Sequence, residues 1–178
     1  MKKVHPKKVF LSKIAIVNLI LSATETYKHE ALGLIFGKVY QDTLMIKNII
    51  GYQTAKRKFT EVSDSKKSIF IKKFLDNNTR LVGDFHSHTD YKGKTHAKIS
   101  NQDIKDMQPG ETSLIIGLAQ LKIRRASIPK NRENDGKGIS FSTNGFKYHI
   151  RCYYKTEDRK LKELKVSTKY FKALKLSS

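Results

Sequence analysis

The sequence has one Cys, three Pro and no Trp among its 178 residues. Because Cys152 is alone, the chain can form no internal disulfide and cannot supply the paired thiolates of a structural zinc site. Any bound metal must therefore be held by His, Asp or Glu. The longest apolar run, Ile14 to Leu21, is interrupted by Asn18 and is too short to cross a membrane. The N-terminal lysines are not followed by the apolar stretch of a secretory signal, so we expect a cytoplasmic protein.

Acidic residues are also scarce. Sixteen Asp and Glu stand against 36 Lys and Arg, which gives a net charge of +20. Such a charge can indicate a nucleic-acid partner. However, only 7 of the 36 basic residues are Arg, the side chain best suited to bidentate recognition of phosphate and guanine. We interpret the dispersed lysines as a solvated surface that could also associate non-specifically with nucleic acid.

The spacing of apolar residues predicts helices that alternate with strands. Expected helices cover residues 12–27, 63 or 64 to 76, and 100–107; expected strands cover residues 31–40, 43–53, 80–88, 113–119, 139–143 and 146–154. Asn144-Gly145 predicts a tight hairpin turn, because these residue types accept positive φ angles. The tail over 159–176 is expected to form a strand followed by a helix. This order predicts an α/β or α+β layered domain.

The histidines indicate a metal site. Expected strand 80–88 ends on His86-Ser87-His88, and side chains two residues apart on a strand point to the same side. Both imidazoles can therefore reach one ion while Ser87 faces the other way. These two residues would supply half of a tetrahedral zinc site.

Two acidic residues could complete this site, and each also has a plainer explanation. Asp103 follows Ser100 by three residues, a spacing typical of a helix capping box, but its carboxylate could equally be a third metal ligand. Glu30 directly precedes strand 31–40, where a solvated surface charge is common. If that strand lies beside the His-x-His strand, Glu30 could instead act as a general base toward water.

Taken together, these motifs resemble those of the JAMM/MPN+ zinc metalloproteases, in a prokaryotic form. The resemblance rests on three motifs in this order: Glu30-x-x-Gly33-x-x-x-Gly37, His86-x-His88 and Ser100-x-x-Asp103. It spans residues 12–154. It implies an MPN/JAB-type fold, in which a mixed β-sheet is flanked by helices with cytidine-deaminase-like layering.

The resemblance also implies a function for each motif. Zinc would be bound by His86, His88 and Asp103; Glu30 would be the general acid/base, and Ser100 would support the oxyanion. Family members cleave isopeptide bonds to ubiquitin or ubiquitin-like proteins, and some prokaryotic relatives process sulfur-carrier proteins. The implied activity is thus zinc-dependent (iso)peptide hydrolysis, with a ubiquitin-like or sulfur-carrier protein as the substrate and no membrane partner.

The chain departs from the family pattern in two places. Thr89 stands where the family usually has proline, and eleven residues separate His88 from Ser100 where the family usually has seven. Extra residues in an exposed loop cost little free energy, so we expect the site to survive with a different loop beside it. We expect one domain over 1–178, made of a core over about 12–154 and a basic extension over 155–178. The sequence leaves the oligomeric state open.

Two alternatives remain at this point. The run Asp84-Phe85-His86-Ser87-His88-Thr89 also resembles the opening motif of PHP-type phosphoesterases, although few histidines follow it to complete a multinuclear site. A non-catalytic RNA-associated module could instead stack bases on strand 146–154. Its candidate residues are Tyr148, Arg151, Tyr153 and Tyr154.

Three further residues receive plain interpretations. His29 and His96 are expected to be solvated loop histidines. Cys152 is expected to be a buried filler, because no neighbouring motif supplies a base that would activate its thiol.

Overall fold

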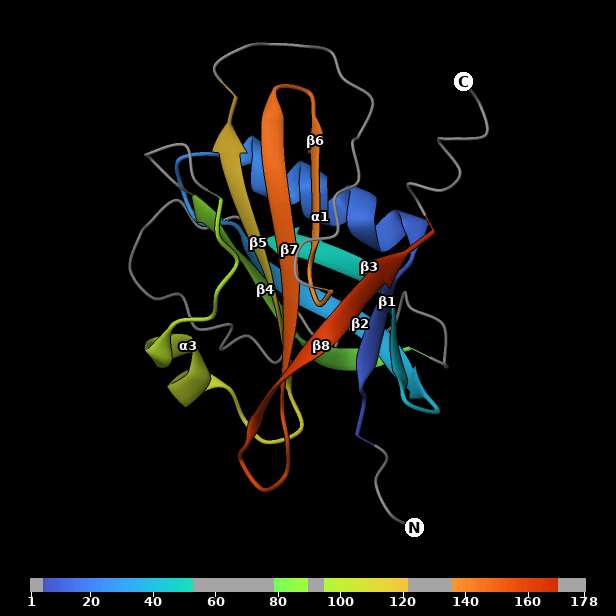
Figure 1. The fold of residues 1–178 in the computed structure, drawn as a ribbon. Helices are drawn as coiled ribbons and strands as arrows, with labels where there is room; N and C mark the ends of the chain where they lie inside the picture. The colour runs from blue at the N-terminus through green and yellow to red at the C-terminus, as the bar shows by residue number, and fades with distance from the viewer. Residues whose placement is uncertain (1–4, 53–78, 90–94, 122–135, 170–178) are drawn as a thin grey trace.

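The computed structural model describes residues 5–52, 79–89, 95–121 and 136–169. Along them run β1 (Lys8–Leu11), α1 (Lys13–Glu25), β2 (Leu32–Tyr40), β3 (Thr43–Tyr52), β4 (Arg80–Thr89), α3 (Asn101–Asp106), β5 (Thr112–Gln120), β6 (Ile139–Thr143), β7 (Phe146–Lys155) and β8 (Leu161–Thr168) (Figure 1). The α+β class predicted from the sequence is confirmed. The helix expected to begin at residue 63 or 64 lies outside the described residues.

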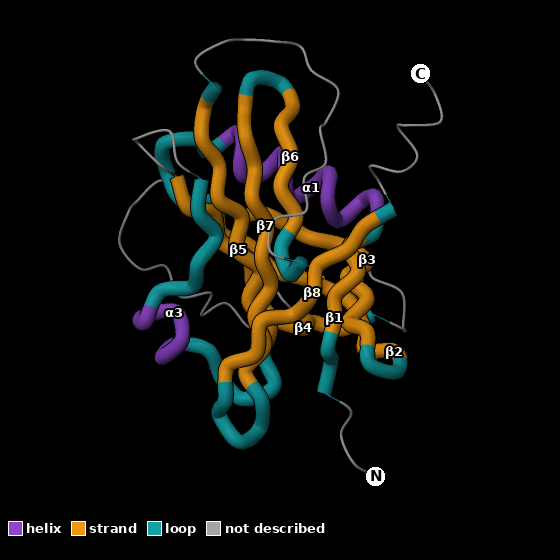
Figure 2. The backbone as a smooth tube through the Cα atoms, in the orientation of Figure 1, coloured by secondary structure: helices purple, strands orange, loops and turns teal. Residues whose placement is uncertain are grey.

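The strands form one mixed sheet that closes on itself. Its order is β5-β4-β2-β3-β1-β8-β7-β6, and β5 also pairs with β7. Strands β1 and β3, β1 and β8, and β4 and β5 pair in parallel, whereas the other pairs are antiparallel. The sheet is strongly twisted, and α1 lies across one of its faces (Figures 1 and 2). Closure gives the sheet an inner face, on which the main core collects.

Helix α1 packs its apolar side against that inner face. Ser12 caps the helix by accepting a hydrogen bond at Oγ from the backbone N–H of Ala15 (3.0 Å), which satisfies one of the donors left free at a helix start. Ile16 and Leu19 are fully buried among side chains of the strands. The helix expected over 12–27 is therefore confirmed, with observed bounds Lys13–Glu25.

Two glycines allow the central strands to lie close together. A Cβ at Gly33 would lie 2.2 Å from Cε1 of Phe85 and 2.3 Å from the carbonyl oxygen of Ile50. A Cβ at Gly37 would lie 2.2 Å from the carbonyl oxygen of Met45. Both glycines are therefore required by the close approach of neighbouring strands.

The hairpin and the tail agree with expectation where they are described. Asn144 and Gly145 have φ angles of 50° and 79°, as a tight turn between β6 and β7 requires. The strand part of the tail is β8, which pairs with β7. Strand β1 is not predicted by the sequence analysis, because a four-residue strand beginning on a lysine carries too little alternation to be recognised.

The face proposed for base stacking is contradicted by the structure. Tyr148, Tyr153 and Tyr154 are 1%, 4% and 8% exposed, so none of their rings is available to a nucleic-acid base. Arg151 is engaged by Glu163, whose Oε1 lies 2.6 Å from Nη1. The alternating aromatics of β7 fill the core on one side of the sheet and pack beneath the 95–99 segment on the other.

One further residue agrees with expectation. Cys152 is fully buried, and burial raises the pKa of its thiol, so it is the inert filler predicted from the sequence.

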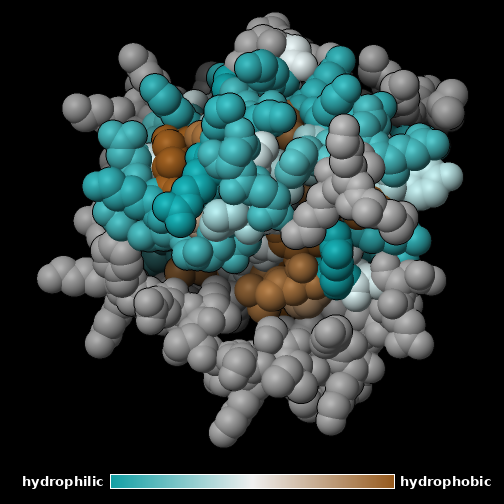
Figure 3. Space-filling model, turned by 90° about the horizontal axis from the view of Figure 1, so that it is seen from below, coloured by the Kyte–Doolittle hydropathy of each residue, from teal (hydrophilic) through white to brown (hydrophobic). Residues whose placement is uncertain are grey.

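On the face seen in Figure 3, hydrophilic side chains cover most of the described surface. Neither α1 nor α3 has the length and apolar character needed to span a membrane.

Candidate metal centre

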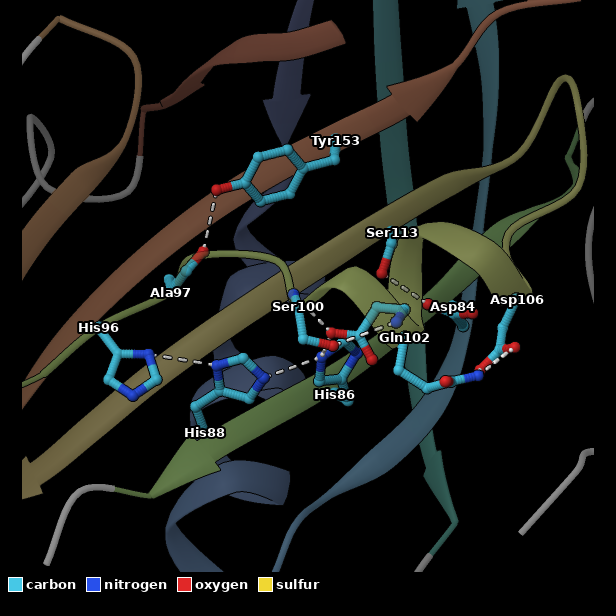
Figure 4. Close-up of polar contacts among 11 residues, drawn as sticks. Asp84, His86, His88, His96, Ala97, Ser100, Gln102, Asp106, Ser113 and Tyr153 are labelled. Atoms are coloured by element: carbon cyan, nitrogen blue, oxygen red, sulfur yellow. Dashed lines mark hydrogen bonds and ion pairs between the residues drawn. The ribbon is translucent and has the colours of Figure 1, made fainter. Parts of the chain in front are cut away.

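Strand β4 presents both histidines on the outer face of the sheet. Nε2 of His86 lies 3.1 Å from Nε2 of His88, and Ser87 between them is fully buried on the opposite face (Figure 4). The alternation predicted from the spacing is confirmed. Two imidazole nitrogens thus converge on one point above the sheet.

Helix α3 brings a carboxylate to the same point. Ser100 Oγ accepts a hydrogen bond from the N–H of Asp103 (3.1 Å), and Asp103 Oδ2 accepts one from the N–H of Ser100 (2.9 Å). The same Oδ2 lies 3.5 Å from Nε2 of His86. The capping box is thus confirmed, and it is compatible with a ligand role, because it fixes the carboxylate in the orientation in which it faces the histidines.

The three side chains fit a single divalent ion. His86, His88 and Asp103 each offer one ligand atom, and these atoms lie within 4.8 Å of one another. Ligands of a tetrahedral zinc ion, with bonds of about 2.0–2.1 Å, are about 3.3 Å apart. The observed separations of 3.1 and 3.5 Å are close to that value. In the part of the chain that the structure describes, no second group of three potential ligands is present.

The surrounding charges give the two histidines different protonation behaviour. Burial disfavours the charged form of His86, but the hydrogen bond and charge of Asp103 outweigh it and raise its pKa. Burial lowers the pKa of His88 to about 4, helped by the positive charges of His86 and His96. Burial also acts on Asp103, but hydrogen bonds from His86 and Ser100 hold the pKa of its carboxyl well below its usual range. His88 is thus neutral near pH 7, as a metal ligand must be.

Glu30 lies at the edge of this cluster, not within it. It directly precedes β2, whose Leu32 pairs with His86, so the strand it adjoins does lie beside the His-x-His strand. Ala31 is held to Ser87 by two hydrogen bonds, Ala31 N–H to Oγ (2.7 Å) and Ser87 N–H to the Ala31 carbonyl (2.9 Å). The Glu30 side chain is exposed, and its negative charge contributes to the raised pKa of His86.

Comparison with known proteins identifies the family. A profile described as prokaryotic homologs of the JAB domain matches residues 12–128, about two thirds of the chain. The chain belongs to this prokaryotic JAB-domain family. The match includes Glu30, the two histidines of β4 and the capping box of α3. No curated protein is significantly similar to the chain.

A solved structure supports the fold of this JAB-domain protein. The solution structure of protein DSY2949 from Desulfitobacterium hafniense superposes with a TM-score of 0.57 at 17% sequence identity. The similarity covers 90% of this chain and 92% of that one. At this identity, the likeness concerns the fold alone.

In this JAB-domain protein, His96 is an exposed loop histidine, as the sequence analysis expects, but it also contacts His88. Its Nδ1 lies 3.4 Å from Nδ1 of His88, and the two rings meet edge to face with centroids 5.1 Å apart (Figure 4). The sequence does not predict this contact, because the return of the 95–99 segment onto the sheet leaves no periodic signal. His29 is likewise exposed, as expected.

Proposed function

We propose that this chain is a zinc-dependent metalloprotease of the JAMM type, which hydrolyses an isopeptide or peptide bond to a ubiquitin-like or sulfur-carrier protein. The observation that supports this proposal most directly is that two imidazoles and one carboxylate bring their ligand atoms within 4.8 Å of one another in a JAB-domain chain. This donor set suits a catalytic zinc ion, which needs three protein ligands and a remaining position for water or substrate.

His86, His88 and Asp103 would hold the zinc ion. When bound, zinc would lower the pKa of water toward neutrality and polarise the scissile carbonyl. The capping box of α3 would keep the Asp103 carboxylate in place, since its Oδ2 already accepts the Ser100 N–H. Orienting a ligand through such a contact raises metal affinity, because less conformational freedom is lost on binding.

Glu30 would move the proton. Its carboxylate would accept a proton from the attacking water and later donate it to the amine that leaves. The two hydrogen bonds between Ala31 and Ser87 would keep the start of β2, and so the Glu30 backbone, beside the histidines. Ser100, next to the ligands, would help to stabilise the oxyanion.

The charge of the molecule bears on the substrate. A net charge of +20 would attract an acidic protein electrostatically and speed its encounter with the site. We therefore propose that the ubiquitin-like or sulfur-carrier substrate presents an acidic surface.

Metal binding tests this function most directly. Zinc content should be measured by elemental analysis for wild type, Asp103→Asn and the control Asp106→Asn, whose exposed carboxylate accepts hydrogen bonds from Gln102 on the same helix. We expect about one zinc per chain in wild type and in the control. Affinity should fall more than about ten-fold in Asp103→Asn, because an anionic ligand is lost.

Other results would contradict the proposal. Two or three metal ions per chain would favour the PHP-type phosphoesterase. If the wild type binds no zinc even when zinc is supplied in excess, the chain would be a JAB-domain protein without catalysis, which binds a partner only.

A further inference from the structure

His96 lies on the side of His88 that faces away from the other candidate ligands. We propose that His96 is a positioning residue for the metal site: its Nδ1 accepts a hydrogen bond from the Nδ1–H of His88 and keeps Nε2 of His88 free for the metal. The inference rests on the proposed function and deepens it. Its basis is the 3.4 Å separation of the two Nδ1 atoms.

The protonation pattern of a neutral imidazole makes this contact informative. Nε2 of His88 is the atom that lies 3.1 Å from Nε2 of His86, on the side where Asp103 also converges. A neutral imidazole has one N–H, so a metal on Nε2 requires the proton on Nδ1. Among the described residues, His96 is the one hydrogen-bond partner that faces this nitrogen.

The backbone at His96 is held by close packing. A Cβ at Gly117 would lie 2.2 Å from the carbonyl oxygen of His96, so this segment rests directly on β5. The next residue, Ala97, is 1% exposed, and its carbonyl accepts a hydrogen bond from Tyr153 Oη (3.2 Å). Ala97 and Ile99 belong to one small apolar cluster, together with Met107, Ile115 and Tyr153. The ring of His96 is exposed, but the backbone that carries it is fixed.

The size of the expected effect follows from the geometry. A ligating histidine usually donates its other N–H to an acceptor, and loss of such an acceptor costs about ten- to a hundred-fold in metal affinity. At 3.4 Å the bond is long, so we expect the lower end of this range, about ten-fold.

Zinc affinity should be measured by competition with a chromophoric chelator. The variants are His96→Ala, His96→Asn and the control Lys98→Ala, an exposed residue of the same segment. We expect zinc binding to weaken about ten-fold in His96→Ala. It should recover in part in His96→Asn, whose Oδ1 can occupy the position of Nδ1, and should stay unchanged in Lys98→Ala. Thermal unfolding in chelator should be the same for all four proteins.

A second measurement separates positioning from a structural role. Long-range ¹H–¹⁵N spectra of the zinc-bound protein should show the proton of His88 on Nδ1 in wild type. Its resonance should shift in His96→Ala, which a merely structural role would not require.

Two outcomes would overturn the inference in different ways. If wild type binds zinc and His96→Ala binds it equally well, the inference fails while the proposed function stands. If wild type binds no zinc, both fail.

Discussion

At the scale of single residues, one carboxylate links local structure to the site. Asp103 Oδ2 accepts the Ser100 N–H at 2.9 Å and faces Nε2 of His86 at 3.5 Å. A capping carboxylate has few alternative positions, because leaving the cap would free a helix-terminal donor. The same short motif therefore starts a helix and orients a candidate metal ligand.

Glu30→Gln tests the proton-transfer role at this scale. The amide keeps the size of the side chain but cannot act as a base, so we expect peptidase activity to fall about 10²- to 10⁴-fold with zinc content unchanged. Activity should be assayed on ubiquitin-like and sulfur-carrier proteins fused at the C-terminus to a reporter. Glu25→Gln, at the exposed end of α1, is the control and should retain full activity. Full activity in Glu30→Gln would exclude the role.

At the scale of elements, the distance between β2 and its neighbours determines where Glu30 lies relative to the histidines. Leu32 pairs with His86 and Gly33 pairs with Phe85 in the antiparallel register of β2 and β4. The Phe85 ring occupies the space that a side chain at Gly33 would need. The geometry of the site thus depends on the absence of a side chain at Gly33, on the strand next to β4.

Gly33→Ala should destabilise the protein. Its Cβ would lie 2.3 Å from the carbonyl oxygen of Ile50, which cannot move without disturbing β3, so we expect a loss of about 1–3 kcal/mol in the free energy of unfolding. Urea unfolding should show a lower midpoint with an unchanged slope. Lys38→Ala on the same strand is the control, with an expected change within about 0.5 kcal/mol. Equal midpoints for Gly33→Ala and wild type would show that β2 and β3 can separate.

At the scale of the whole molecule, closure of the sheet unites segments from both ends of the described chain. Strand β1 pairs with β3 on one side and β8 on the other, and β5 pairs with both β4 and β7. Val9 and Leu11 of β1 are fully buried in the main core. The outer face that carries the histidines is supported by this core.

The free energy of unfolding should depend on pH in opposite ways below and above pH 6.5, because the pKa values of the two histidines are shifted in opposite directions. Because the pKa of His88 is lowered from 6.5 to about 4, its charged form is disfavoured in the fold, and stability is lost as pH falls from 6.5 to 4. Because the pKa of His86 is raised, its contribution is fully present below pH 6.5 and is lost as pH rises through the higher value.

This pH dependence can be measured by urea unfolding in chelator between pH 4 and 8.5. Relative to wild type, His88→Gln should remove part of the loss on the acidic side, and His86→Gln part of the loss on the alkaline side. Curves of the variants parallel to wild type would contradict the assignment.

Local chemistry is enough to predict most elements of this protein. The Ser12 cap, the alternation that puts His86 and His88 on one face, and the Asn144-Gly145 turn all depend on neighbours in the chain. The sequence alone determined these features because propensity, capping and strand alternation act over a few residues.

Only the tertiary structure decided the rest. The pairing of β1 with β3 and β8, and the contact between His96 and His88, join segments that carry no local signal for each other. Likewise, the capping box of α3 can be read from the sequence, but its position beside His86 cannot. The strand pairings form because closing the sheet buries the main apolar core, and a second, smaller apolar cluster holds the 95–99 segment and α3 on the outer face. Both gains come from segments far apart in the chain rather than from any short segment.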